Sequence, residues 1–115
     1  MRRGDVVLVD FEPSQGSEAN KTRPAVVVSN DAANRAAQHS RHGVITVVPV
    51  TSNVSRVLAF QVLIPAGQGG LRVDSKAQAE QVRAVAASRV GRQVGSLAAE
   101  TMKQLDGALR LHLGL

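Results

Sequence analysis

The chain has 115 residues, the size of one ordinary domain, and it contains no cysteine, so it can form no disulfide. Its apolar runs are far shorter than the roughly 20 residues of a membrane-spanning helix, and no charged-then-apolar leader precedes the first strand, so we expect a soluble, cytoplasmic protein with a single domain, residues 1–115. The formal charge of +5 and the pI near 11.1 favour a polyanionic partner such as nucleic acid.

The first part of the chain predicts two strands joined by a long loop. Residues 5–11 are almost continuously apolar, which indicates a strand covered on both faces. Residues 12–22 form a polar loop that is long for a hairpin, and such loops are often functional. Pro24 has a fixed φ and no N–H group, which suits the start of the short apolar strand at 25–28. Arg23 is therefore expected on a rigid element, at the mouth of this strand.

A short helix and a third strand follow. Asn30 or Asp31 can cap an alanine-rich helix that ends near residue 38. Residues 44–50 then predict a strand, and Pro49 near its end indicates a sheet edge or a barrel rim. Residues 51–53 follow this strand with two hydroxyl groups and an amide.

The remainder of the chain predicts further short strands and a closing helix. The expected strands span residues 60–64, 71–76, 79–85 and 93–95. Three glycines within residues 65–70 mark a turn. Apolar residues at three-and-four spacing predict an amphipathic helix over 97–113, which Ser96 can cap. Several short strands followed by one helix indicate a mainly β fold with α (α+β), a small open β-barrel with a short internal helix and a C-terminal amphipathic helix.

The chain lacks the usual motifs of metal and nucleotide enzymes. It has no Cys, no His-x-x-x-His pair, no carboxylate cluster at metal spacing and no glycine fingerprint for phosphate, so we expect neither a metal nor a cofactor. Aromatic residues make up only 2% of the chain, so an RNA-binding protein of this composition would read bases by hydrogen bonds in pockets. An arginine such as Arg23 can also simply brace a carboxylate in the fold, and spacing alone favours that structural role.

Six ordered motifs favour a more specific hypothesis. They are GD at 4–5, DFEP at 10–13, GSE at 16–18, RPAVVVS at 23–29, VPVTS at 48–52 and FQVL at 60–63, and the segment 77–85 and the closing helix continue the match. In this order and spacing they closely resemble the MazF/PemK family of bacterial toxin ribonucleases. The resemblance covers essentially the whole chain.

The resemblance implies an SH3-like barrel with a C-terminal helix that acts as a homodimer and has a cognate acidic antitoxin as its partner. It implies a toxin of a type II toxin–antitoxin system that cuts single-stranded RNA, such as mRNA, at short sequences without a metal ion, and so inhibits translation and growth. The catalytic pair of the family matches Arg23 and Thr51, and the glutamate of its Gly-Ser-Glu loop matches Glu18. We expect substrate contacts from a further set of polar residues: Lys21, Ser52, Asn53, Arg56, Glu80, Gln81 and Arg83.

Arginine and threonine suit cleavage through the 2′-hydroxyl. As that oxygen attacks, negative charge builds on the phosphoryl oxygens, to which the Arg23 guanidinium can donate two hydrogen bonds and Thr51 a third. Neither residue is an obvious base, since arginine stays protonated and a threonine hydroxyl is a poor proton acceptor. Glu18, or Arg23 acting unusually, are the candidates for removing the 2′ proton. Leu8 stands where some relatives carry Trp, which leaves the cleavage sequence open.

Two other functions stay open on the sequence. A barrel toxin of similar shape could bind and poison a protein target such as DNA gyrase through its C-terminal helix, and Arg23 and Thr51 would then be incidental. A non-catalytic, basic RNA-binding barrel is the other alternative.

Overall fold

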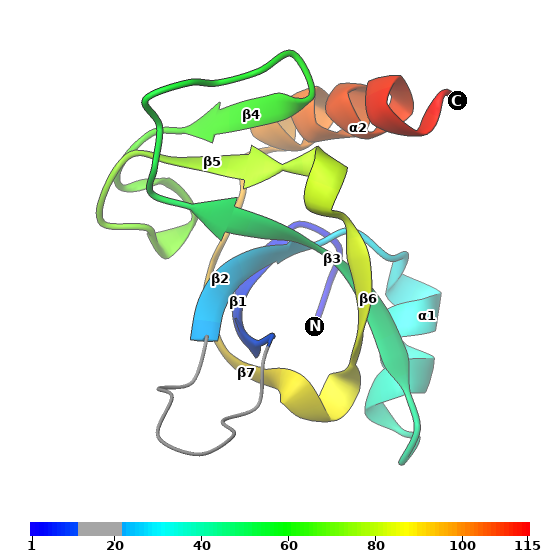
Figure 1. The fold of residues 1–115 in the computed structure, drawn as a ribbon. Coiled ribbons are helices and arrows are strands. Elements are labelled where there is room, and N and C mark those ends of the chain that lie inside the picture. Colours follow the sequence, from blue (N-terminus) through cyan, green and yellow to red (C-terminus); the bar gives the residue numbers. More distant parts are fainter. Residues whose placement is uncertain (12–21) are drawn as a thin grey trace, which may run out of the picture.

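The fold is an antiparallel β-sheet that curls into an open barrel, with one helix at each side (Figure 1). The structure is a computed structural model that describes residues 1–11 and 22–115. Its strands are β1 (Asp5–Asp10), β2 (Thr22–Val27), β3 (Val44–Thr51), β4 (Gln61–Ile64), β5 (Ser75–Gln78), β6 (Arg83–Ala86) and β7 (Val90–Ser96). The helices are α1 (Asp31–Gln38) and α2 (Ala99–Leu113), and the short 3₁₀ turns are η1 (Gln68–Gly70), η2 (Ala79–Gln81) and η3 (Ala87–Arg89).

The strands follow the order β4-β5-β3-β2-β1-β7, and β6 pairs with the first half of β3. The central strand β3 therefore changes partner along one edge: Val44–Val47 pair with β6, and Val50–Thr51 pair with β5. This arrangement confirms the expected mainly β fold with an open barrel and two helices.

Pro49 is not at a sheet edge or rim, contrary to the sequence prediction. It is buried opposite Ala25, in a strand that is paired on both sides. It lies between the stretch that pairs with β6 and the stretch that pairs with β5, so its missing N–H group interrupts neither ladder.

The sheet buries side chains on both faces, as the continuous apolar runs predict. On one face Val6, Val26 and Val48 pack with Leu105 of α2. Their neighbours on the other face pack with Ala37 of α1; this second cluster includes Val7, Val9, Ala25, Val27 and Val47. Successive residues of a strand point to opposite faces, so an unbroken run of valines supplies both clusters.

The two helices begin differently. Asn30 caps α1 as predicted, because its Oδ1 accepts a hydrogen bond of 2.8 Å from the Ala33 N–H. The predicted cap of α2 is wrong: the helix begins after Ala98 without a side-chain cap, and Ser96 ends β7. The Ser96 hydroxyl donates instead to Asp5 Oδ1 at 2.9 Å, which ties β7 to β1.

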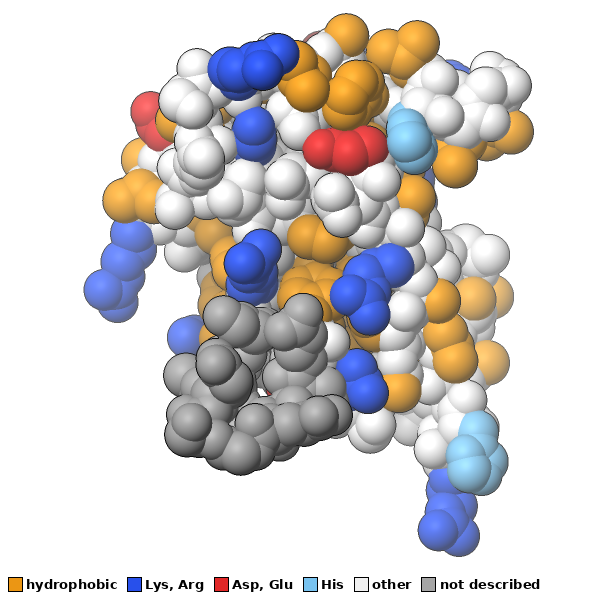
Figure 2. Space-filling model, viewed as in Figure 1, with side chains coloured by type: hydrophobic (Ala, Val, Ile, Leu, Met, Phe, Trp, Pro, Cys, Tyr) orange, Lys and Arg blue, Asp and Glu red, His pale blue; other side chains and the backbone are white. Residues whose placement is uncertain are grey.

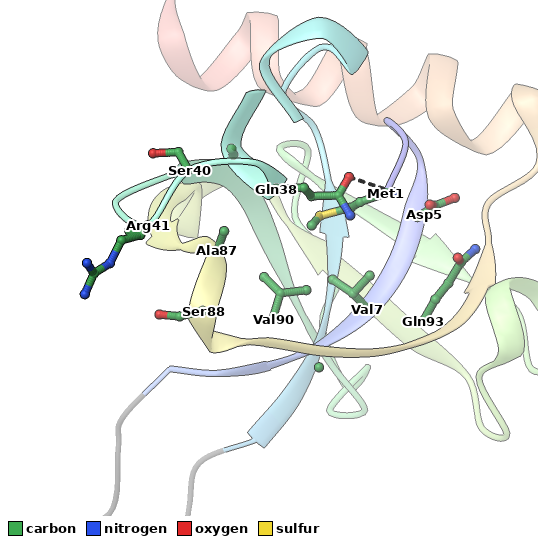
Figure 3. A pocket seen from close by; sticks show the side chains of 12 residues that line it. Met1, Asp5, Val7, Gln38, Ser40, Arg41, Ala87, Ser88, Val90 and Gln93 are labelled. Carbon is green, nitrogen blue, oxygen red and sulfur yellow. Dashed lines mark hydrogen bonds between the residues drawn. The ribbon is translucent and has the colours of Figure 1, made fainter. Parts of the chain in front are cut away.

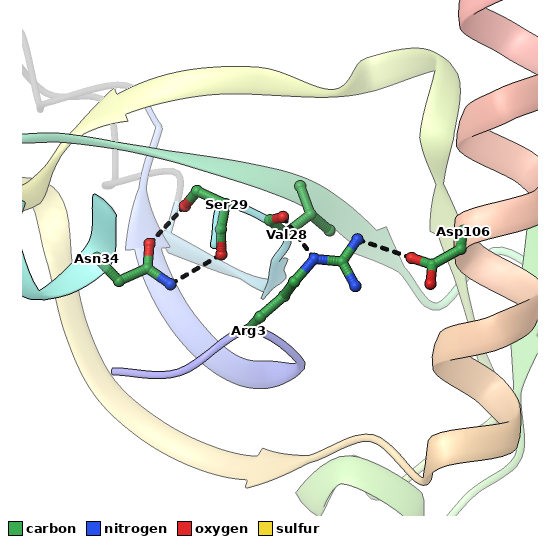
Figure 4. Close-up of polar contacts among 5 residues, drawn as sticks. All are labelled: Arg3, Val28, Ser29, Asn34 and Asp106. Atoms are coloured by element: carbon green, nitrogen blue, oxygen red, sulfur yellow. Dashed lines mark hydrogen bonds and ion pairs between the residues drawn. The ribbon is translucent and has the colours of Figure 1, made fainter. Parts of the chain in front are cut away.

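Polar contacts tie the residues after β2 to α1 directly and to α2 through Arg3 (Figure 4). Asn34 is fully buried; its Nδ2 donates to the Ser29 carbonyl at 2.9 Å, and its Oδ1 accepts from the Ser29 hydroxyl. Arg3 donates from Nε to the Val28 carbonyl at 2.8 Å and pairs with Asp106 of α2 at 2.7 Å. These contacts fix the far end of β2, which steadies the strand that carries Arg23.

The predicted strands at 71–76 and 79–85 are placed wrongly. Residues 71–74 precede the strand, β5 spans only Ser75–Gln78, and the η2 turn separates it from β6. The alternation of polar and apolar residues is interrupted inside this turn, where Glu80 and Gln81 are adjacent, but two neighbouring polar residues are too weak a signal to predict a turn. The turn at 65–70 is confirmed, since Gly67, Gly69 and Gly70 all adopt a positive φ.

Candidate active site

Arg23 and Thr51 lie at the ends of neighbouring strands, where the ladder between β2 and β3 stops. The last paired residues are Ala25 and Pro49, so Arg23 and Thr51 each lie two residues beyond the last pair of this ladder. Pro24 cannot donate to the ladder, so the two strand ends are free to separate. Between them lies a cleft of about 370 Å³, lined by Arg23, Pro24, Val50, Thr51, Ser52, Leu71, Arg72, Val73 and Ser75.

The Thr51 hydroxyl is oriented by the loop that follows it. Its Oγ1 accepts a hydrogen bond of 3.2 Å from the Asn53 N–H. Asn53 Oδ1 in turn accepts hydrogen bonds from the N–H and the hydroxyl of Ser55, at 3.3 and 2.9 Å. Because one lone pair of Thr51 Oγ1 is occupied by the backbone, its own O–H remains able to donate toward an anion in the cleft.

The loop of residues 52–60 is tied to the sheet at two further points. Lys76 Nζ donates to the Arg56 carbonyl at 2.6 Å. Gln61 accepts from the Leu58 N–H at 3.0 Å through Oε1 and donates through Nε2 to Glu80 Oε2 at 2.7 Å. The loop behind Thr51 is therefore held in one conformation by side chains of β4, β5 and η2.

Basic side chains lie at the cleft, which Arg23 and Arg72 line, and around Phe11 after the end of β1. Arg83 stacks over the Phe11 ring, 5.2 Å from its centroid, and Arg89 Nη1 donates to the Phe11 carbonyl at 3.3 Å. Figure 2 shows Lys and Arg side chains gathered around a hydrophobic patch in the middle of this face. Such a surface suits a polyanion, because its cations can neutralise successive phosphates.

The structure brings together only part of the predicted site. Arg23, Thr51 and Ser52 line the cleft, and Asn53 contacts Thr51. Glu18 and Lys21 lie outside the described residues.

The other predicted substrate contacts lie apart from the cleft lining. Arg56, Gln81 and Arg83 are exposed, whereas the Glu80 carboxylate is engaged by Gln61. Leu8 lies in β1 opposite Pro24, next to Val9, which is paired with Arg23.

Sequence reasoning missed three residues beside the cleft. Arg72 and Ser75 line it, and Lys76 is paired across the strands with Thr51. All three fall in a segment that the alternation pattern predicts as a strand with one wet face, so nothing distinguished them from ordinary surface residues. The one feature of the sequence that could have drawn attention to this segment is the position of Arg72, a basic residue just after the glycine turn.

A larger cavity of about 540 Å³ lies on another part of the molecule, between α1, β1 and β7 (Figure 3). The side chains of Val7 and Val90 point into it, and the amino group of Met1 donates to Gln38 Oε1 at 3.3 Å. None of the predicted site residues lines it. The predicted residues Arg23, Thr51 and Ser52 line the smaller cleft instead.

Neither a metal-binding cluster nor a membrane-spanning helix is found in the described residues. In residues 1–11 and 22–115, no group of three His, Asp or Glu side chains is arranged to hold a metal ion. No helix in the described ranges is long and apolar enough to cross a membrane.

Comparisons with known proteins place this geometry in a family. The chain is 57% identical over 115 residues to Endoribonuclease MazF9 of Mycobacterium tuberculosis, covering 100% of this chain and 98% of the relative. Its structure is similar to MazF in a MazE–MazF complex from Deinococcus radiodurans, with a TM-score of 0.80 and 29% identity over 100% of this chain and 96% of that one. A mycobacterial endoribonuclease in complex with its cognate antitoxin shares the fold, with a TM-score of 0.77 and 24% identity over 100% and 96% of the two chains.

The family model for the PemK-like, MazF-like toxin of type II toxin–antitoxin systems matches residues 2–113. This match spans the strands, both helices and the cleft between β2 and β3, and it confirms the resemblance seen in the sequence motifs. The chain belongs to the PemK-like, MazF-like toxins of type II toxin–antitoxin systems.

Proposed function

We propose that this toxin is an endoribonuclease that cuts single-stranded RNA at the cleft between Arg23 and Thr51. The activity is the one named for its relative MazF9, with which it shares 57% identity over its full length. The observation that carries the proposal is that Arg23 and Thr51, which lie beyond the last pair of the β2–β3 ladder, line one cleft.

This pair fits a transesterification. The 2′-oxygen of the substrate attacks the adjacent phosphorus, a new P–O2′ bond forms and the P–O5′ bond breaks. The products are a 2′,3′-cyclic phosphate and a 5′-hydroxyl, so the 2′ proton leaves and the O5′ oxygen gains one. Arg23 and Thr51 donate hydrogen bonds to the phosphoryl oxygens, where negative charge grows in the transition state.

Two arginine side chains at the cleft supply the positive charge that phosphoryl transfer requires. Arg23 and Arg72 both line the cleft. A bidentate guanidinium matches two phosphoryl oxygens geometrically and keeps its charge at every physiological pH. We therefore expect cleavage without a divalent ion. Glu18 is our candidate for the base that removes the 2′ proton, from its place in the Gly-Ser-Glu motif.

The remaining predicted residues act on the RNA outside the scissile phosphate. We propose that they line the path of the strand and read its bases: Lys21, Ser52, Asn53, Arg56, Glu80, Gln81 and Arg83. With Phe11 and Phe60 as the only aromatic residues of the chain, hydrogen bonds rather than stacking would carry this recognition.

Two protein partners complete the proposal. Three large apolar side chains near the end of α2 are exposed, namely Leu111, Leu113 and Leu115, and they suit burial in a two-fold homodimer. An acidic antitoxin would cover the basic face and the cleft. The structural relatives in complexes with MazE or with a cognate antitoxin support this second partner.

The decisive experiment incubates the pure protein with a panel of single-stranded RNAs in chelator and identifies the ends of the products. We expect cyclic phosphate and 5′-hydroxyl ends, and we expect a substrate with a 2′-deoxy sugar at the scissile nucleotide to bind but survive. Cutting of the deoxy substrate would refute the mechanism. Inhibition of DNA gyrase without any RNA cleavage would refute the function.

A further inference from the structure

Lys76 is a buried lysine directly beside the proposed catalytic threonine. In the pairing of β3 with β5, Lys76 stands opposite Thr51, and on the other edge of β5 it stands opposite Leu63. Directly opposed residues of an antiparallel pair project to the same face of the sheet. Thr51 and Lys76 therefore project to the same face of the sheet, beside the cleft that Thr51 and Arg23 line.

The burial of Lys76 requires a reason, because a lysine is almost never buried unless a partner holds its ammonium group. Its relative exposure is only 8%, and the contact that the structure gives is the 2.6 Å hydrogen bond from Nζ to the Arg56 carbonyl. A charged donor on a carbonyl makes one of the stronger hydrogen bonds in proteins. The buried ammonium group of Lys76 thus holds the Arg56 carbonyl in place.

That carbonyl belongs to the loop that orients the Thr51 hydroxyl. From Thr51 the contacts run through the Asn53 N–H on Oγ1, through Asn53 Oδ1 to Ser55, and then to Arg56, which is the next residue in the chain. Lys76 closes this sequence of contacts on the strand opposite Thr51. The segment from Asn53 to Arg56 is therefore held at one end by Thr51 of β3 and at the other by Lys76 of β5, which are paired across the two strands.

We propose that Lys76 is a positioning residue for RNA cleavage, which holds the loop of residues 52–60 so that the Asn53 N–H orients the Thr51 hydroxyl toward the scissile phosphate. The role rests on the proposed ribonuclease function and deepens it. It predicts that Lys76 acts through Thr51, and that its loss lowers the rate of the chemical step more than the affinity for RNA. A misplacement of about 1 Å in a catalytic group can cost on the order of 100-fold in rate.

The test compares Lys76→Met with Lys76→Arg and with Lys103→Met. Methionine has a length similar to that of lysine but carries no charge, whereas arginine can still donate to the Arg56 carbonyl. Lys103 is exposed on α2, so Lys103→Met removes the same charge at a position away from the cleft. In single-turnover cleavage of one RNA at saturating protein, we expect Lys76→Met to be slower by about 10- to 100-fold. Lys76→Arg should recover much of the rate, and Lys103→Met should match the wild type. Affinity for the 2′-deoxy substrate should change no more in Lys76→Met than in Lys103→Met.

A double-mutant cycle and hydrogen exchange separate positioning from other roles. In a Thr51→Val background, Lys76→Met should cost little further rate, because the hydroxyl that it orients is already absent. The Asn53 amide should exchange faster with solvent in Lys76→Met, while the amides shared by β2 and β3 keep their protection.

Three outcomes would overturn this role. They are wild-type rates in Lys76→Met, the same loss of rate with and without Thr51, and a loss confined to RNA affinity. If the wild-type protein cleaves no RNA in the same assay, the proposed function itself fails and takes this role with it. Wild-type cleavage beside an unaffected Lys76→Met contradicts only the role of Lys76.

Discussion

Replacing Arg23 by lysine tests whether the planar guanidinium or merely its charge is required. Arg23 follows Thr22 in β2, and its backbone is paired with Val9, so a lysine at this position starts from the same place on the strand. It keeps one positive charge but cannot place two N–H groups on two phosphoryl oxygens. Losing one well-aimed donor to a developing anion costs about 10²- to 10³-fold in rate, or roughly 3 to 4 kcal/mol. We therefore expect Arg23→Lys to be nearly as inactive as Arg23→Ala.

The structure also predicts that these variants fold normally. Arg23 is exposed, and substitutions at exposed positions usually change the free energy of unfolding by less than about 0.5 kcal/mol. The measurement is single-turnover cleavage of a fixed RNA, with thermal melting of each variant as the control for folding. Arg35→Lys, at an exposed position of α1, is the matched control and should cleave like the wild type. If Arg23→Lys cleaves within a few-fold of the wild type, Arg23 contributes only charge and the assigned mechanism is wrong.

The other predictions concern Thr51, the antitoxin, the dimer and the packing of α1. Thr51→Ser keeps the hydroxyl and should cleave RNA far better than Thr51→Val; equal rates for the two would mean that Thr51 only terminates β3. A saturating amount of the cognate antitoxin should abolish cleavage and protect the basic face in footprinting, and full activity in the complex would contradict this occlusion. Sedimentation at micromolar concentration should show a dimer, and a single species near the monomer mass of 12.1 kDa would refute it. Asn34→Ala should lower the free energy of unfolding in urea by about 2 to 3 kcal/mol, because it removes the fully buried amide and both of its hydrogen bonds to partly buried groups of Ser29. Arg3→Ala should cost at most about 1 kcal/mol, because its ion pair with Asp106 is partly exposed, and a larger cost than for Asn34→Ala would contradict this ranking.

Local sequence determined the elements whose signals are contained in a few neighbouring residues. The apolar run that opens the chain predicts β1 and its burial on both faces, because successive strand residues point to opposite sides. Asn30 predicts the start of α1, because its side chain caps a backbone N–H only three residues away. The three-and-four spacing of apolar residues predicts α2 and the burial of Leu105. The ordered motifs predict the family, which the match over residues 2–113 confirms.

The candidate site was predictable only in part. The motifs identify Arg23 and Thr51 through the resemblance, and Pro24 indicates that Arg23 is held on a strand. The role of each remaining side chain depends on contacts that a motif does not encode. Glu80 illustrates this: its place in the family segment predicts a contact with RNA, and only the structure shows that its Oε2 also accepts a hydrogen bond from Gln61 of β4.

Tertiary structure alone decided how the strands share their partners and which side chains meet at the cleft. The partner change of β3 at Pro49 brings β5 rather than β6 beside Thr51, and with it Lys76. The η2 turn separates β5 from β6, and in the sequence it is marked only by the adjacent polar residues Glu80 and Gln81. Periodicity reports which face of an element is buried, but the pairing of β3 with β5 depends on contacts such as that of Thr51 with Lys76, which are distant in the chain and which no local pattern contains. Thr51 and Lys76 therefore meet only in the folded sheet.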